Sequence, residues 1–113
     1  YIIMSSTVNS YMGNIHSEGY LSLHKQDENP LSEPDHGQIY AKEESGTTRL
    51  FAMDGDGNST QISPHNANGE WVFFSKNTKT GRTIRINMER MIKRIEEITG
   101  ESFIEEWFEI IQK

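Results

Sequence analysis

The sequence predicts an α+β chain in which short antiparallel β-hairpins and a meander lead to two short C-terminal helices. Three observations support this fold class. Short apolar runs alternate with clusters of Gly, Asp and Asn over much of the chain, a pattern typical of hairpins. Residues 71–111 hold 17 large apolar residues in 41 positions, whereas residues 24–49 hold only four apolar residues. Only 34% of the 113 residues are hydrophobic, so we expect burial that is shared between subunits.

The composition excludes several classes of protein. The chain has no cysteine, which rules out disulfide frameworks, thiolate metal sites and cysteine nucleophiles. No apolar run approaches the roughly 18 residues of a membrane span, and the net charge of −6 argues against general affinity for nucleic acids. The sequence begins with a small apolar cluster at residues 1–4 rather than with Met, and we expect it to be the trimmed C-terminal piece of a longer polypeptide.

Residues 1–62 are expected to form a β-rich, extended region. Residues 19–24 have leucines at a spacing of two, which predicts a short extended segment, and the prolines and acids of residues 26–37 predict a surface loop. A meander follows, because turn residues separate three short apolar runs at 38–42, 49–53 and 59–62. The candidates for its one apolar face are Ile39, Leu50 and Ile62.

Residues 63–113 are expected to form a hairpin followed by a two-helix trimerisation module. The hairpin strands are residues 70–76 and 82–87, and Gly81 supplies the positive φ that the loop between them needs. Alternation along the first strand places Trp71 and Phe73 on one face and Val72 and Phe74 on the other. Both faces are therefore apolar, and we expect burial on both sides.

The first helix begins after Asn87, which suits an N-cap, and ends at Gly100. Its apolar residues are Met88, Met91, Ile92, Ile95 and Ile98. Four of them, all except Ile92, fit successive a and d positions of a coiled coil, and isoleucine at both favours three or more strands. An intertwined homotrimer and an ordinary helix packed on its own sheet both fit this pattern.

The second helix is expected to begin at Ser102, because Ser102 and Glu105 match a capping box. Apolar residues nearly encircle it: Phe103, Ile104, Trp107, Phe108, Ile110 and Ile111. An element this apolar is buried in an oligomer interface or bound to a partner. We favour an interface, made of Met88, Met91, Ile92, Ile95, Ile98, Phe103, Trp107 and Phe108.

The charged residues form two blocks. Residues 76–94 carry seven bases and one acid, and residues 96–109 carry six acids and no base. The simplest interpretation is that these blocks pair within or between subunits or stay solvated. A nucleic-acid surface is less favoured, because no aromatic stacking residues are interleaved with its candidate bases, Arg82, Arg85, Arg90, Lys93 and Arg94.

No catalytic motif is present, so we expect no enzyme and no cofactor. Residues 54–58, with the sequence DGDGN, resemble the start of a calcium loop, but Ser59 and His65 stand where an EF-hand has Gly and Glu. A hairpin turn explains the same residues without a metal. We expect no metal site within one chain, although a threefold axis could gather three copies of one histidine. The histidines are scattered, at His16, His24, His36 and His65.

Part of the chain resembles viral surface proteins. The segments GQIYAK at 37–42, RLF at 49–51 and DGDGNSTQIS at 54–63 are similar to a short module of bacteriophage tail-fibre and other virion surface proteins. The segments SPHN at 63–66, GEW at 69–71 and 77–89 are similar to C-terminal regions of virus-like sequences from environmental samples. The resemblance implies a homotrimeric fibre or spike component of the virion, and it carries over no catalytic residue.

The expected function is therefore structural. The C-terminal module would register three chains and drive assembly of a viral fibre or spike, because a compact local unit avoids the loop-closure cost of joining long β-segments first. One alternative is a module that binds a host receptor or glycan through Trp71, Phe74 or the loop at residues 26–37. A second alternative is a small nucleic-acid-associated viral protein, whose affinity would fall steeply with salt.

Overall fold

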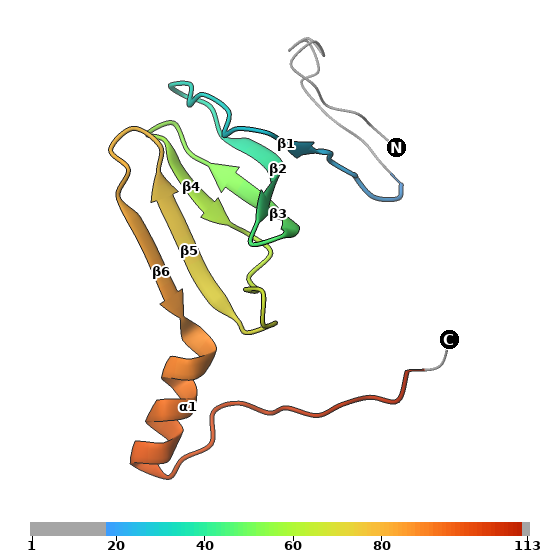
Figure 1. Cartoon of the computed structure of the whole chain (residues 1–113), viewed down its shortest axis with the longest axis vertical. Helices are drawn as coiled ribbons and strands as arrows, with labels where there is room; N and C mark the ends of the chain where they lie inside the picture. Colours follow the sequence, from blue (N-terminus) through green and yellow to red (C-terminus); the bar gives the residue numbers. More distant parts are fainter. Residues whose placement is uncertain (1–17, 112–113) are drawn as a thin grey trace.

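The computed structural model describes residues 18–111, which form one six-stranded sheet followed by one helix (Figure 1). The strands lie side by side in chain order, with β1 parallel to β2 and every other neighbouring pair antiparallel. The predicted α+β class and its hairpins are confirmed. The elements are β1 (Lys25–Gln26), β2 (Gln38–Glu44), β3 (Thr47–Met53), β4 (Asn58–Gln61), β5 (Val72–Asn77), β6 (Thr83–Asn87) and α1 (Met88–Thr99).

The turns lie where the sequence predicted them. Ser45 and Gly46 form the two-residue connection between β2 and β3. Gly81 has a φ of 79° in the turn between β5 and β6, as its place in the sequence predicted. In the same turn the side-chain oxygen of Asn77 accepts hydrogen bonds from the backbone N–H groups of Lys79 and Thr80, both at 2.9 Å.

One continuous sheet crosses the predicted boundary between residues 62 and 63. Strands β4 and β5 are paired, with Ser59 opposite Lys76 and Thr60 opposite Ser75. The predicted meander and the predicted hairpin are therefore parts of the same sheet. Residues 62–71 form the loop that joins them.

The sheet packs one of its faces around a small core. Tyr40, Phe51 and Met53 are buried there, and half-buried Phe74 packs against them. The rings of Tyr40 and Phe51 are stacked, with their centroids 5.5 Å apart. We term this side of the sheet the core face.

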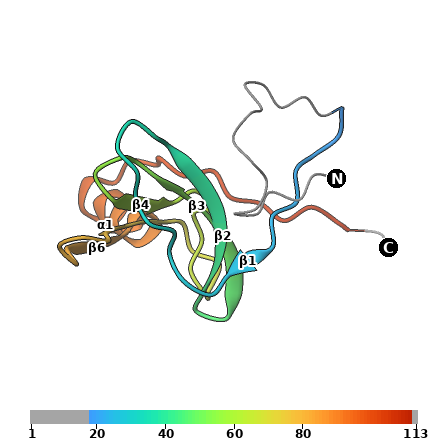
Figure 2. The ribbon, with the colours of Figure 1, turned by 90° about the horizontal axis from the view of Figure 1, so that it is seen from above.

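The sheet is curled toward the core face. Arg85 of β6 and Glu44 of β2 form an ion pair of 2.9 Å, although in a flat sheet these strands would lie about 19 Å apart. Figure 2, in which the ribbon is seen from above, shows the strands turning out of a single plane. The curl therefore brings two strands with a wide sequence separation into contact across the core face.

The outer face of the sheet, on the side opposite the core face, buries Ala41 but leaves several large apolar side chains exposed. Its exposed apolar side chains include Ile39 at 66%, Leu50 at 41% and Ile62 at 48%. The three candidates do share one face, but the expectation of a single apolar face is wrong, because the core of the chain lies on the other face. Alternation made both faces candidates. On the core face the Tyr40 hydroxyl also bonds the loop before β2, where it donates to Asn29 Oδ1 at 3.0 Å.

The predicted second helix is wrong, because residues 101–111 form no regular secondary structure. A short helix is marginal in water unless its apolar side is packed. The carboxylate of Glu96 in α1 accepts hydrogen bonds from the backbone N–H groups of Phe103 and Ile104, at 2.6 and 3.0 Å. In the predicted helix, the side chain of a Ser102 cap would accept a hydrogen bond from the N–H of Ile104. Glu96 of α1 already accepts from this N–H group, so it competes with the predicted cap.

In residues 18–111 the structure contains no helix that is long and apolar enough to cross a membrane. The first 17 residues, which belong to the predicted N-terminal region and include His16, lie outside the described residues.

Candidate functional site

The apolar stripe of α1 is the first feature of the candidate site. The helix is amphipathic, yet it buries none of its residues within the chain. Met91, Ile95 and Ile98 are 46%, 42% and 69% exposed, while Met88 and Ile92 are half-buried. Helices in proteins gain most of their stability by packing such a stripe. The described part of the chain does not supply that packing.

Hydrogen bonds cap both ends of α1 and attach its start to the loop before β5. The Asn87 side-chain oxygen accepts from the backbone N–H of Arg90 at 2.9 Å, which confirms the predicted N-cap. The N–H of Gly100 donates to the Glu96 carbonyl at 2.8 Å and closes the other end. The Asn87 amide also donates to the Glu70 carboxylate at 3.1 Å, which ties the helix start to the loop before β5. The backbone N–H of Glu89 also donates to the Trp71 carbonyl at 3.1 Å, so two bonds attach the start of the helix to this loop.

The Glu70 carboxylate joins two segments at this junction. It accepts hydrogen bonds from the side-chain amides of Asn66 and Asn87, at 3.0 and 3.1 Å. These two bonds, with the Asn66 bond as the larger effect, lower the pKa of Glu70. The junction is therefore held by the charged form of the carboxylate.

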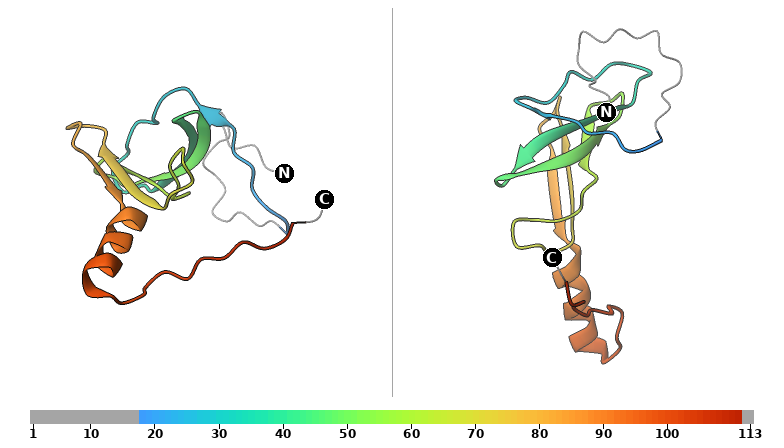
Figure 3. Two further views of the ribbon diagram at one scale, coloured as in Figure 1. Left: turned by 60° about the horizontal axis from the view of Figure 1, so that its bottom comes forward. Right: turned by 90° about the vertical axis from the view of Figure 1, so that its right-hand side faces the viewer.

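The C-terminal tail, residues 101–111, is the second feature. Trp107 is 67% exposed, and Phe108 and Ile110 are each 91% exposed. The bonds from the N–H groups of Phe103 and Ile104 hold the tail to α1 and lower the pKa of the Glu96 carboxyl. Glu106 of the tail also pairs with Lys93 of α1 at 3.9 Å. The rest of the tail runs away from the helix, as the left view of Figure 3 shows. Large apolar side chains therefore stand in solvent on an extended segment.

The outer face of the sheet is the third feature. Phe73 of β5 and Ile86 of β6 lie directly opposite each other, and they are 42% and 38% exposed. Together with Ile39, Leu50 and Ile62 they form an apolar surface across several strands. Exposed apolar surfaces of this kind mark protein interaction sites. The chain therefore exposes apolar side chains in the sheet as well as in α1 and the tail.

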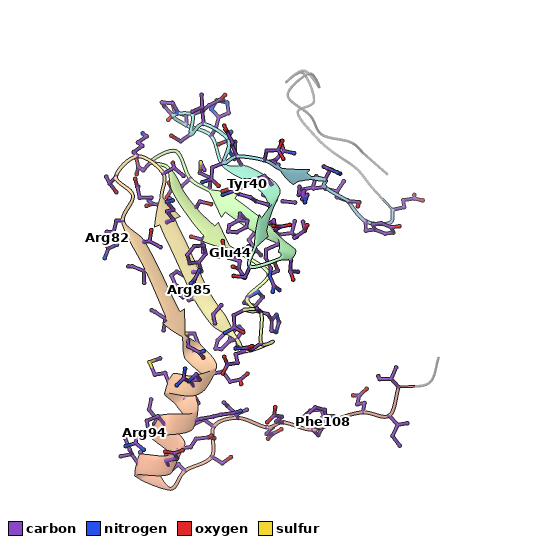
Figure 4. All side chains as sticks on the ribbon, in the orientation of Figure 1. Tyr40, Glu44, Arg82, Arg85, Arg94 and Phe108 are labelled. Carbon is purple, nitrogen blue, oxygen red and sulfur yellow. The ribbon has the colours of Figure 1, made fainter. Side chains whose placement is uncertain are left out.

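Most of the predicted nucleic-acid contacts are engaged with acidic residues. Arg85 pairs with Glu44 and also lies over the Phe74 ring, at 4.6 Å from its centroid. Lys93 pairs with Glu89 at 3.3 Å. Arg94 pairs with Glu97 at 2.7 Å. Figure 4 shows that the labelled Arg82, Arg85 and Arg94 are spread from β6 to the end of α1, so the bases do not form one compact patch.

The two aromatic residues predicted as ligand contacts lie apart. Phe74 belongs to the core face and packs on Tyr40, Phe51 and Met53. Trp71 is three positions earlier in an alternating strand, so it belongs to the opposite face, where it is 43% exposed. The structure does not bring Trp71 and Phe74 together on one surface.

Residues 54–57 form the turn between β3 and β4, as the hairpin interpretation of 54–58 predicted, and Asn58 begins β4. The Asp54 carboxylate accepts from the backbone N–H groups of Asp56 and Asn58, at 3.0 and 2.9 Å, and from the Asn58 side-chain amide at 2.9 Å. The side-chain amide bond is the largest of the effects that lower the pKa of Asp54. Its oxygens therefore hold the turn. Over residues 18–111 no group of three or more His, Asp or Glu side chains is arranged to hold a metal ion.

Comparison of the chain with protein-family models, with curated proteins and with solved structures finds no match. The candidate site consequently rests on the geometry of the chain itself. Two of its features were missed by sequence reasoning: the Glu96 carboxylate that holds the tail, and the exposed edge of β6. No sequence pattern indicates either feature. Glu96 lies seven residues before Phe103, in a different element. The free edge depends on the order of the strands in the sheet.

Proposed function

We propose that this chain is a structural component of a viral fibre or spike, in which α1 and the C-terminal tail drive assembly of a homotrimer. The observation that carries the proposal is the amphipathic helix without a buried residue. A chain that exposes this stripe together with the apolar tail would bury the most apolar surface by packing them against copies of itself. The resemblance of residues 37–63 to modules of virion surface proteins supports the viral context.

A trimer is the oligomer that the stripe favours. Met88, Met91, Ile95 and Ile98 occupy successive a and d positions, and isoleucine at both positions of a heptad disfavours two-stranded packing. All four residues belong to one helix whose two ends are hydrogen-bonded, so three copies would meet at an axis without reorganising the helix. The remaining exposed surfaces would then be available to neighbouring chains.

Substitution of Ile95 by Asp tests the proposal. The change places a charge in the centre of the stripe, and we expect it to convert the assembly to single chains. Ile95 is 42% exposed and outside the core of Tyr40, Phe51 and Met53, so the sheet should stay folded. The measurement is the mass by light scattering over a dilution series, with circular dichroism to check the sheet.

The matched control is Glu97→Asp, which introduces the same residue type on the polar side of the same helix and keeps the charge. We expect the control to retain a mass of three chains of 13.0 kDa each. A wild-type chain that has the mass of one subunit at every concentration would overturn the proposal.

A further inference from the structure

Strand β6 leaves an open edge on the sheet. It is the last of the six strands, so within the described residues its outer edge faces no other strand (Figure 1). An open edge presents unpaired backbone N–H and C=O groups and is a template for another strand. The opposite edge is different, because β1 lies there and pairs Lys25 and Gln26 with β2. The edge strand β6 has five residues and leads directly into α1, whereas β1 at the opposite edge has two.

The C-terminal tail has the properties of a strand without a sheet. Residues 105–111 are extended in no regular structure, and no hydrogen bond holds their backbone within the described part of the chain. In Figure 1 the tail leaves α1 on the side away from β6 and continues to the right, whereas β6 forms the left edge of the sheet. The tail is thus directed away from the β6 edge of its own chain.

The side-chain patterns of the two segments match. Ile84, Arg85 and Ile86 form an apolar, basic, apolar triplet in β6, and Phe108, Glu109 and Ile110 form an apolar, acidic, apolar triplet in the tail. Because strand side chains alternate, pairing the triplets would place the apolar residues together on the outer face and the two charges together on the core face. The match holds for parallel and antiparallel pairing, since the charged residue is central in both triplets.

Arg85 has the capacity for a second carboxylate. Its side chain is 56% exposed although it pairs with Glu44, and a guanidinium has five N–H donors. The charges of the wider segments agree with this pairing. Residues 72–87 contain four bases and no acid, while the tail contains four acids and no base. The two segments therefore attract each other electrostatically through their opposite net charges, whatever their exact register.

We propose that residues 107–111 of one copy add as a seventh strand to the outer edge of β6 in another copy. Backbone hydrogen bonds would supply the affinity, and the matched triplets would set the register. If each chain gives its tail to the next, three chains close a ring and leave no β6 edge free. This inference rests on the proposed assembly and names the contact that links its subunits.

A photo-crosslinking amino acid tests the inference in the full chain. We would replace Phe108 by p-benzoylphenylalanine, which preserves an aromatic side chain, and mix chains labelled with ¹⁴N and ¹⁵N before irradiation. We expect cross-linked peptides of mixed isotope composition that map to residues 83–87. The matched control places the same group at Phe103, which α1 holds through Glu96, and should give no cross-link to β6.

Charge reversal provides a second measurement. Glu109→Arg would oppose two like charges across the new pair, and we expect it to lower the yield of the cross-link severalfold. Glu105→Arg changes the same residue type in the same tail but outside the triplet, and it should leave the yield unchanged.

The outcomes separate the two proposals. An assembly with the mass of three chains whose Phe108 position cross-links within one chain, to another element or not at all would overturn the tail exchange and leave the proposed function standing. A monomeric mass would overturn the proposed assembly and the exchange with it.

Discussion

The sheet and the C-terminal part of this chain are in opposite situations. The sheet closes around its own core, with Tyr40, Phe51 and Met53 buried and Arg85 brought to Glu44 by the curl. The helix and the tail lie in the region with the highest density of apolar residues, yet α1 buries none of them. The density of apolar residues along a sequence therefore does not locate the core of one chain. In the proposed assembly it locates what several chains bury together.

The largest expected effect comes from removing the sheet's own core. Phe51→Ala deletes a buried ring, so we expect a loss of about 3–5 kcal/mol in the free energy of unfolding. The measurement is urea unfolding of chains that carry Ile95→Asp as a common background, which isolates the single chain. Leu50→Ala is the matched control, since Leu50 is adjacent but 41% exposed on the outer face. Equal losses for both variants would contradict the assignment of the two faces.

A smaller effect is expected where two turns of the sheet meet. Gly57 has a φ of 86°, and a Cβ atom there would lie 2.8 Å from the hydroxyl of Thr78. Gly57→Ala should cost about 1–3 kcal/mol, read from thermal unfolding. Gly46→Ala is the control, because Gly46 has the same φ of 86° with nothing within 4 Å. The difference between the two variants measures the contact between the turns, and no difference would mean that only backbone strain matters.

The smallest effect concerns the hydroxyl in the core. Burial raises the pKa of Tyr40, whose hydroxyl bonds to Ser59 and Asn29. Above pH 10, the ordinary value for tyrosine, the unfolded chain loses this proton while the folded chain keeps it, so stability falls as the pH rises. Tyr40→Phe should cost about 1 kcal/mol at neutral pH and flatten this alkaline loss. A control variant, Tyr20→Phe, alters an exposed residue and should leave the stability and its pH profile unchanged.

The sequence predicted the elements better than their packing. Strands and turns were found because residues such as Gly46, Asp54 and Gly81 have local conformational preferences. The ends of α1 were found for the same reason, from Asn87 and Gly100. These are properties of a few neighbouring residues, which a single sequence contains in full.

The packed face could not be predicted in this way. Ile39 and Tyr40 are neighbours that point to opposite faces, and both are apolar enough for a core. What distinguishes them is contact with distant residues: the Tyr40 ring stacks on Phe51, and its hydroxyl bonds to Asn29 and Ser59. The absence of the second helix has a similar origin, since Glu96 holds the N–H of Phe103 from the preceding element.

The order of the strands has a consequence for how the molecule forms. Every strand pairs with its neighbours in the sequence, so each pairing closes only a short stretch of chain, which favours fast folding. The Arg85–Glu44 pair, 41 residues apart, is formed when the curl is complete. In the proposed assembly each subunit would finish its sheet while its partners are still distant. Encounter between subunits would then be the slow step, and its rate would depend on concentration.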